Sequence, residues 1–201
     1  MVPYSEVKAQ NIAGIYRMSG GHEMVAAFEF KKDSSFKFYF IYGAVDRSAS
    51  GKYEIKAGNI ILHAHKKPGH DFTIVHQKKQ GDGTSIKISN ANTILLRNIV
   101  GIFKKGNTED LQHSNNEGFI HSKLGDCDSV LVLHELFPDV PTIVRTKETT
   151  NKNNYFELTL NPSLSALSFK DFTLLITTDG LTGSLPWLFE RDKVVFVKEG
   201  N

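Results

Sequence analysis

Residues 24–42 carry the pattern that most constrains the fold of this chain. Apolar side chains alternate with others from Met24 to Phe30, and the alternation resumes from Phe36 to Tyr42 after a short turn around Asp33. Side chains two positions apart on a strand point to the same face, so this period predicts strands with one buried face. Two such runs joined by a few turn residues predict a β-hairpin with aromatic pairs across it.

Strand signals continue along the chain, and helix signals are scarce. Short strand-like runs recur at a spacing of about 8–12 residues with turn residues between them, which is typical of a sandwich or a barrel. These runs cover residues 52–56, 60–65, 72–77, 85–89, 93–96, 99–104, 118–123, 129–136, 142–146, 155–160, 172–177 and 193–198. One helical turn is expected at 162–169, with Asn161 as its cap and Pro162 at its first position.

The expected fold is therefore all-β, in two domains. An antiparallel meander or barrel over residues 1–97 is followed by a β-sandwich over residues 98–201, with the boundary just after Leu96. A chain of 201 residues is long enough for two small domains or one large one. At this length a buried core holds the fold without disulfides.

Composition excludes several classes of protein. There are 24 Lys and Arg residues against 22 Asp and Glu, a net charge of +2, so we expect neither nucleic acid nor an anionic membrane as a partner. A single cysteine, Cys127, excludes an internal disulfide and a cysteine-based zinc site. No run approaches the ~20 apolar residues of a transmembrane helix.

The first half of the chain contains a recognisable series of motifs: Gly14-Ile15-Tyr16, the aromatic run 36–40, Tyr42-Gly43-Ala44-Val45-Asp46 and Gly51-Lys52-Tyr53. It resembles a group of uncharacterised, usually exported proteins of Gram-negative bacteria. It is also similar to small lipocalin-like barrels, in which a Gly-x-Trp or Gly-x-Tyr strand opens an up-and-down meander. Tyr16 and Tyr53 stand where Trp is common in those patterns. The resemblance implies a domain that binds or supports and does not catalyse.

The second half contains Val100-Gly101-Ile102 and Asn116-Glu117-Gly118-Phe119-Ile120. This run resembles transthyretin-like or carboxypeptidase-regulatory-like sandwiches. Together the resemblances imply a periplasmic or secreted protein whose leader is absent from this numbering. The opening MVPYSEVKAQNIAG has no apolar stretch typical of a signal peptide, so a cytoplasmic location stays open.

The function expected from these observations is a non-catalytic ligand-binding or protein-interaction module of the bacterial cell envelope, without a cofactor. The partner is a small apolar ligand or another protein. The hypothesis for the ligand site is an apolar cup with a polar rim, formed by Phe36, Phe38, Phe40, Tyr42, Asp46 and Arg47. In the alternative interpretation, the phenylalanines are core residues and Asp46 orders a turn.

A different class of function rests on histidines. His63 and His65 lie two apart on an expected strand, and His76 lies on the next, so the three imidazoles could share a metal ion in a metal-dependent hydrolase. Incidental clustering of the 8 histidines is the alternative. No His-Glu-x-x-His, nucleophile-elbow or phosphate-loop motif is present, so no catalytic residues are predicted. Trp187, in an apolar cluster, is either a core plug or a docking residue.

Overall fold

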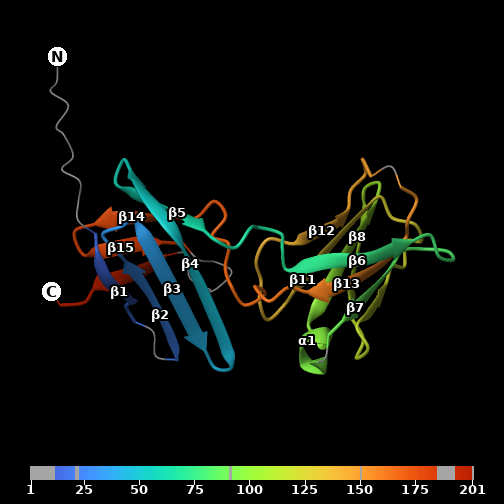
Figure 1. Ribbon diagram of the computed structural model, residues 1–201, viewed down its shortest axis with the longest axis horizontal. Coiled ribbons are helices and arrows are strands. Elements are labelled where there is room, and N and C mark those ends of the chain that lie inside the picture. The colour runs from blue at the N-terminus through green and yellow to red at the C-terminus, as the bar shows by residue number, and fades with distance from the viewer. Residues whose placement is uncertain (1–11, 21–22, 91, 150, 185–192, 201) are drawn as a thin grey trace, which may run out of the picture. The chain divides into compact units, whose positions relative to one another are not determined.

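The computed structural model describes residues 12–20, 23–90, 92–149, 151–184 and 193–200, and their secondary structure is almost entirely β. Trp187 lies outside the described residues. The chain forms two compact units, one of residues 1–65 with 171–201 and the other of residues 66–170 (Figure 1). The all-β fold predicted from the alternating pattern is confirmed.

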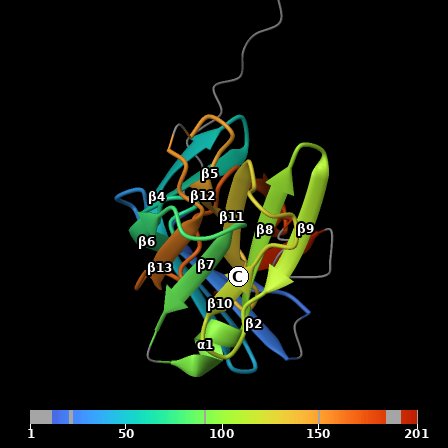
Figure 2. The ribbon, with the colours of Figure 1, turned by 90° about the vertical axis from the view of Figure 1, so that its right-hand side faces the viewer.

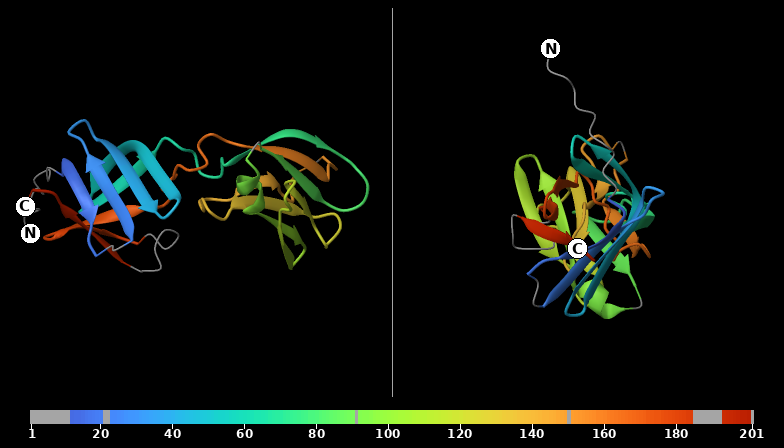
Figure 3. Two further views of the ribbon diagram at one scale, coloured as in Figure 1. Left: turned by 90° about the horizontal axis from the view of Figure 1, so that it is seen from below. Right: turned by 90° about the vertical axis from the view of Figure 1, so that its left-hand side faces the viewer.

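The first unit is a closed, eight-stranded antiparallel barrel. Its strands are β1 (Gly14–Met18), β2 (Met24–Phe30), β3 (Ser35–Tyr42), β4 (Val45–Lys56), β5 (Asn59–Ala64), β14 (Thr173–Thr177), β15 (Gly180–Gly183) and β16 (Val194–Lys198). Each strand pairs with the next in this order, and β16 pairs with β1. The barrel is therefore up-and-down, with its wall formed by the blue-to-cyan β1–β5 and the orange-to-red β14–β16 in Figure 3.

Phenylalanine side chains fill the barrel. The predicted hairpin is confirmed, with Phe28 opposite Phe38 and Phe30 opposite Phe36. Among the described residues of this unit, the buried phenylalanines are Phe28, Phe30, Phe36, Phe38, Phe40, Phe172 and Phe196. The Phe28 ring centroid lies 4.6 Å from that of Phe38 and 5.0 Å from that of Phe196. An eight-stranded barrel has an interior just wide enough for side chains to fill, and aromatic residues do so here.

The second unit is a β-sandwich of two four-stranded sheets, ordered β10-β7-β13-β6 and β12-β11-β8-β9 (Figure 2). Its elements are β6 (Phe72–Lys78), β7 (Ser85–Ser89), α1 (Thr93–Arg97), β8 (Ile99–Lys105), β9 (Thr108–His113), β10 (Phe119–His121), β11 (Ser129–His134), β12 (Thr142–Arg145) and β13 (Tyr155–Leu160). Inward side chains of both sheets, among them Ile86, Phe103, Val132 and Phe156, share one core.

The expected division between residues 1–97 and 98–201 differs from the one the structure has. The second unit is inserted between β5 and β14, so the barrel uses both ends of the chain. β6 and β7, expected in the first domain, pair with β13 of the second unit. The physical reason is that period-two alternation identifies a strand and its buried face but not its partner, and β14–β16 pair with strands far away in the sequence.

Three local expectations are corrected as well. Residues 93–97 form the helix α1 and not a strand, because the Asn92 side chain accepts the Ile94 backbone N–H at 3.0 Å and caps the turn. Residues 162–169 form no helix: 162–165 make a turn in which the Leu164 N–H donates to the Asn161 carbonyl at 3.0 Å, and 167–169 have no regular structure. β9 and β15 are strands that the expected runs did not include.

A buried ion cluster anchors the start of the second unit. Only 3% of the Lys66 side chain is exposed, and its Nζ lies 2.5 Å from an Asp71 oxygen and 2.9 Å from an Asp139 oxygen. Lys66 also donates to the Ala166 carbonyl at 2.8 Å, and Asp139 accepts from the backbone N–H and hydroxyl of Ser168. The cluster therefore ties together the segments by which the chain enters and leaves this unit.

We predict that Lys66→Met destabilises the protein by about 3–5 kcal/mol, because it leaves two buried carboxylates without their cation. The free energy of unfolding, measured with urea, checks this. The matched control is Lys67→Met, because Lys67 is the exposed neighbour, and it should stay within about 0.5 kcal/mol of the parent protein. Equal effects of the two substitutions would contradict a specific role for the cluster.

Candidate ligand-binding site

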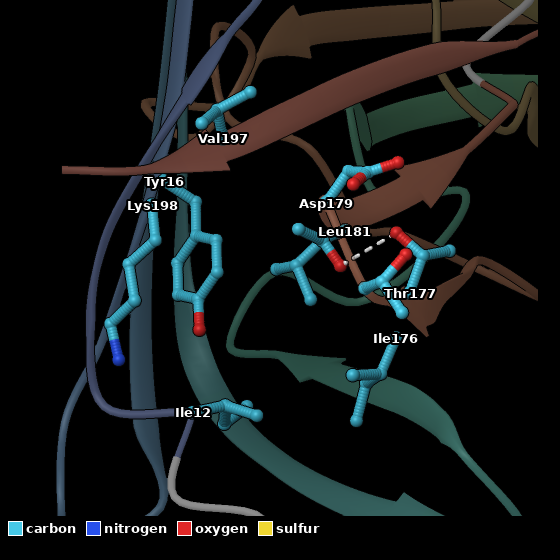
Figure 4. Close-up of a pocket in the computed structure, with 10 residues that line it drawn as sticks. Ile12, Tyr16, Ile176, Thr177, Asp179, Leu181, Val197 and Lys198 are labelled. Atoms are coloured by element: carbon cyan, nitrogen blue, oxygen red, sulfur yellow. Dashed lines mark hydrogen bonds between the residues drawn. The ribbon is translucent and has the colours of Figure 1, made fainter. Parts of the chain in front are cut away.

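A cavity of about 510 Å³ opens at one end of the barrel, where β1 begins, β16 ends and the turn joins β14 to β15 (Figure 4). The volume lies within the range of small-molecule sites, roughly 300–1,000 Å³. Its walls come from sequence positions near both ends of the chain, because the antiparallel order brings those strand ends together. We name it the mouth pocket.

One wall of the mouth pocket is apolar and rests on the barrel core. Ile12 and Leu181 are buried beside it, and Ile176 is half-buried. The Tyr16 ring, also buried, meets the Phe30 ring edge-on with centroids 5.8 Å apart. Phe30 in turn meets the Tyr53 ring at 5.1 Å. Because these rings interlock with the packed interior, the wall is a fixed surface and not a loose cluster of side chains.

Lys198 brings a positive charge to the pocket. It pairs in register with Tyr16, and its Nζ lies 5.7 Å from the centroid of the Tyr16 ring. Its aliphatic stem crosses Gly14, where an added Cβ would come within 2.7 Å of the Lys198 Cε. Gly14 also has a φ of 143°, which L side chains rarely adopt. Glycine at this position therefore gives the lysine its path across β1 toward the pocket.

The opposite side of the pocket is the polar turn between β14 and β15. The Thr177 hydroxyl donates to the Gly180 carbonyl at 3.1 Å, which holds the turn closed. The Thr178 and Asp179 side chains also line the pocket and are exposed. Figure 4 shows Asp179 across the pocket from Lys198. The site thus combines an apolar wall with a few polar groups at its edges, an arrangement typical of small-molecule sites.

Burial determines the state of the Tyr16 hydroxyl. Loss of solvation raises the pKa of Tyr16 above its ordinary value of 10.0, and the neighbouring Tyr53 raises it further. Burial, with a smaller effect of Asp33, also raises the pKa of Tyr53. Both phenols therefore remain neutral at physiological pH. The side chains of charged type among the described lining residues are those of Lys198 and Asp179.

The residues predicted to form a cup do not line the mouth pocket. Phe36, Phe38 and Phe40 point inward and are packed in the barrel core. Tyr42 and Asp46 are exposed, and alternation along β4 directs Asp46 outward. Arg47 is buried on the inward side, opposite Phe40. A cup bounded by these residues stays a prediction.

The three histidines predicted to bind a metal come from both units, and a metal site formed by them stays a prediction. His63 and His65 belong to the first unit and His76 to the second. His63 lies 3.3 Å from Glu54, and His65 lies 3.2 Å from the Ser50 hydroxyl. Across the described ranges of the chain, no group of three His, Cys, Asp or Glu side chains is arranged to hold a metal ion.

Little in the sequence pattern points to the mouth pocket. Tyr16 was singled out only through a resemblance, and Ile176, Asp179 and Lys198 carry no motif. Neither protein-family models nor curated protein sequences give a match to this chain. None of the helices within the described residues is long and apolar enough to span a membrane.

We predict that Tyr16→Phe removes a phenol that loses its proton above pH 10.0. The folded state holds this proton more tightly than the unfolded chain does. The contribution of the Tyr16 phenol to the free energy of unfolding is therefore complete below pH 10.0 and declines as the pH rises further. Phenolate absorbance measured during an alkaline titration of both proteins checks this. If the difference between them appeared below pH 10.0, the buried setting of Tyr16 would be wrong.

Proposed function

We propose that this protein is a non-catalytic binding module whose barrel holds a small amphipathic molecule in the mouth pocket. The observation that carries the proposal is the combination of a cavity of about 510 Å³, an apolar wall and a few polar groups at its edges. The apolar, aromatic interior of the barrel supports it. Because its rings are already packed, few side chains have to become ordered when a ligand binds against them.

The phenylalanine cluster inside the barrel limits how far a ligand can enter from the mouth pocket. The Phe28 ring contacts the rings of Phe30, Phe38, Phe172 and Phe196. These contacts occupy the middle of the barrel, so a ligand in the mouth pocket stays near the barrel end. Ile12, Ile176 and Leu181 would cover its apolar body.

The proposal includes the absence of catalysis and a place in the bacterial cell envelope. Lys198 and Asp179 lie on opposite sides of the pocket (Figure 4), an arrangement that supports binding and offers no nucleophile paired with a base. The envelope location rests on the resemblance of residues 14–53 to exported Gram-negative proteins. Fractionation of the native host tests it, and recovery in the cytoplasm alone would exclude it.

We predict that Ile176→Trp weakens binding of the neutral fluorescent probe N-phenylnaphthylamine at least about tenfold, because the larger side chain fills part of the pocket. Leu175→Trp is the matched control, since Leu175 is the next residue on β14 and is 47% exposed. It should leave binding unchanged. Fluorescence titration gives the affinity and the number of sites, expected to be one per chain.

Retained circular dichroism and thermal midpoint show whether each tryptophan variant is folded. If Ile176→Trp is not, Ile176→Phe replaces it, with Leu175→Phe as its control. Unchanged probe binding in the folded Ile176 variant, or no saturable binding by the parent protein, would contradict the proposal.

A second candidate function, self-association, is supported by the outer face of one sandwich sheet. The β12-β11-β8-β9 sheet carries a row of apolar side chains in register across its four strands: Ile143, Leu131, Ile102 and Leu111. Ile143 is 59% and Leu111 52% exposed. Antiparallel sheets that face water usually alternate apolar and polar residues, so a row of this kind is typical of an interaction surface.

We further propose a second copy of the chain as the partner of this row. Polar pairs flank the row on both sides: Lys104 forms an ion pair with Glu109 at 2.8 Å, and the His113 Nδ1 lies 3.4 Å from a Glu135 oxygen. A two-fold axis running along the row would place Glu109 of one copy opposite His113 of the other. The face is therefore complementary to itself in apolar contact, and its flanking carboxylate and imidazole are complementary as hydrogen-bonding groups.

We predict that the protein forms a dimer at micromolar or higher concentration and that Ile143→Lys converts it to a monomer. The control is Val75→Lys, because Val75 on β6 is 60% exposed and lies on the other sheet. Sedimentation velocity measures both variants. A parent protein that stays monomeric, or equal dissociation by the control, would exclude this interface.

A further inference from the structure

The charge of Lys198 is the feature of the mouth pocket that selects among ligands. The residue is half-buried, and its Nζ lies 5.7 Å from the centroid of the Tyr16 ring. None of the ion pairs found among the described residues includes Lys198. A lysine that is partly withdrawn from water gains from an opposite charge, so the pocket presents a cation suited to an incoming anion.

The adjacent carboxylate does not supply that anion. Glu199 follows Lys198 but faces the outer surface of the barrel, where the Arg17 Nε donates to it. Arg17 also donates to the Tyr39 hydroxyl at 2.7 Å, which fixes the guanidinium on that outer face. Because successive side chains alternate across a strand, the Arg17–Glu199 pair and Lys198 lie on opposite sides of the wall.

Asp179 is the other charged residue of the pocket, and its setting differs from that of Lys198. It is exposed at the tip of the β14–β15 turn, on the far side of the pocket in Figure 4. Water and salt screen an exposed charge more strongly than a half-buried one. An anion beside Lys198 is therefore favoured over a cation beside Asp179.

We propose that the ligand is an organic anion, a carboxylate on an apolar body, whose acid group binds the Lys198 Nζ. Its body lies against Ile12, Ile176 and Leu181, which line the same pocket as the Tyr16 ring that runs beside the lysine in Figure 4. This inference rests on the proposed function and deepens it by naming the chemical class of the ligand.

The test compares two probes of equal shape, naphthoate and its neutral amide, by calorimetric titration of the full chain. We expect naphthoate to bind about tenfold more tightly than naphthamide, since hydrogen bonds to charged groups are stronger than neutral ones. Lys198→Met should abolish this preference by weakening the binding of naphthoate about tenfold more than that of naphthamide. Lys198→Arg should retain it. Lys193→Met is the matched control, because it removes the same charge from an exposed position just before β16.

The outcomes separate the two proposals. If both probes bind equally and Lys198→Met changes neither affinity, the mouth pocket binds ligands, but the proposal that its ligand is an anion is wrong. If Lys193→Met reduces the preference as much as Lys198→Met does, the effect comes from net charge and the site at Lys198 is overturned. If neither naphthoate, naphthamide nor N-phenylnaphthylamine binds, the proposed function fails, and this inference fails with it.

Discussion

Pairing between β1 and β16 is the contact on which the barrel depends. Tyr16 stands opposite Phe28 on one side and Lys198 on the other, so β1 joins the two ends of the wall. Without this contact, two strand edges would be left unpaired and the aromatic interior would open to water. The residues that meet here are far apart in the chain; Arg17 and Glu199, for example, are separated by 182 positions. Since the entropy of loop closure rises only slowly with loop length, the inserted sandwich adds little to this cost.

The mouth pocket is a consequence of the same closure. Ile12 and Tyr16 come from the first strand region, and Lys198 comes from the last. The β14–β15 turn completes the rim because β14 takes its place beside β5 after the inserted unit. None of these segments forms a pocket alone. The candidate site therefore exists only in the closed barrel, and its ligand would stabilise the pairing of β1 with β16 by binding the folded state.

Sequence patterning predicts the local elements well and their long-range partners poorly. The hairpin of residues 24–42 and its inward phenylalanines are confirmed, because alternation directly encodes a buried face. The units divide after His65 and after Lys170 and not after Leu96, because alternation along a strand does not record which strand it pairs with. Arg47 is buried, although arginine side chains mostly lie at the surface. Lys66 is buried as well, and the carboxylates of Asp71 and Asp139 pair with it. The mouth pocket forms only when β1 pairs with β16, and no local sequence pattern predicts that pairing.

Isoleucine methyl NMR during titration with naphthamide tests the central claim most directly, because Ile12 and Ile176 line the mouth pocket while Ile102 and Ile143 lie on the outer face of the sandwich. The account predicts saturable shifts of the Ile12 and Ile176 methyl signals with a single affinity, and none at Ile102 and Ile143. Saturable shifts at Ile102 and Ile143 with unchanged Ile12 and Ile176 signals would contradict it and assign ligand binding to the second unit.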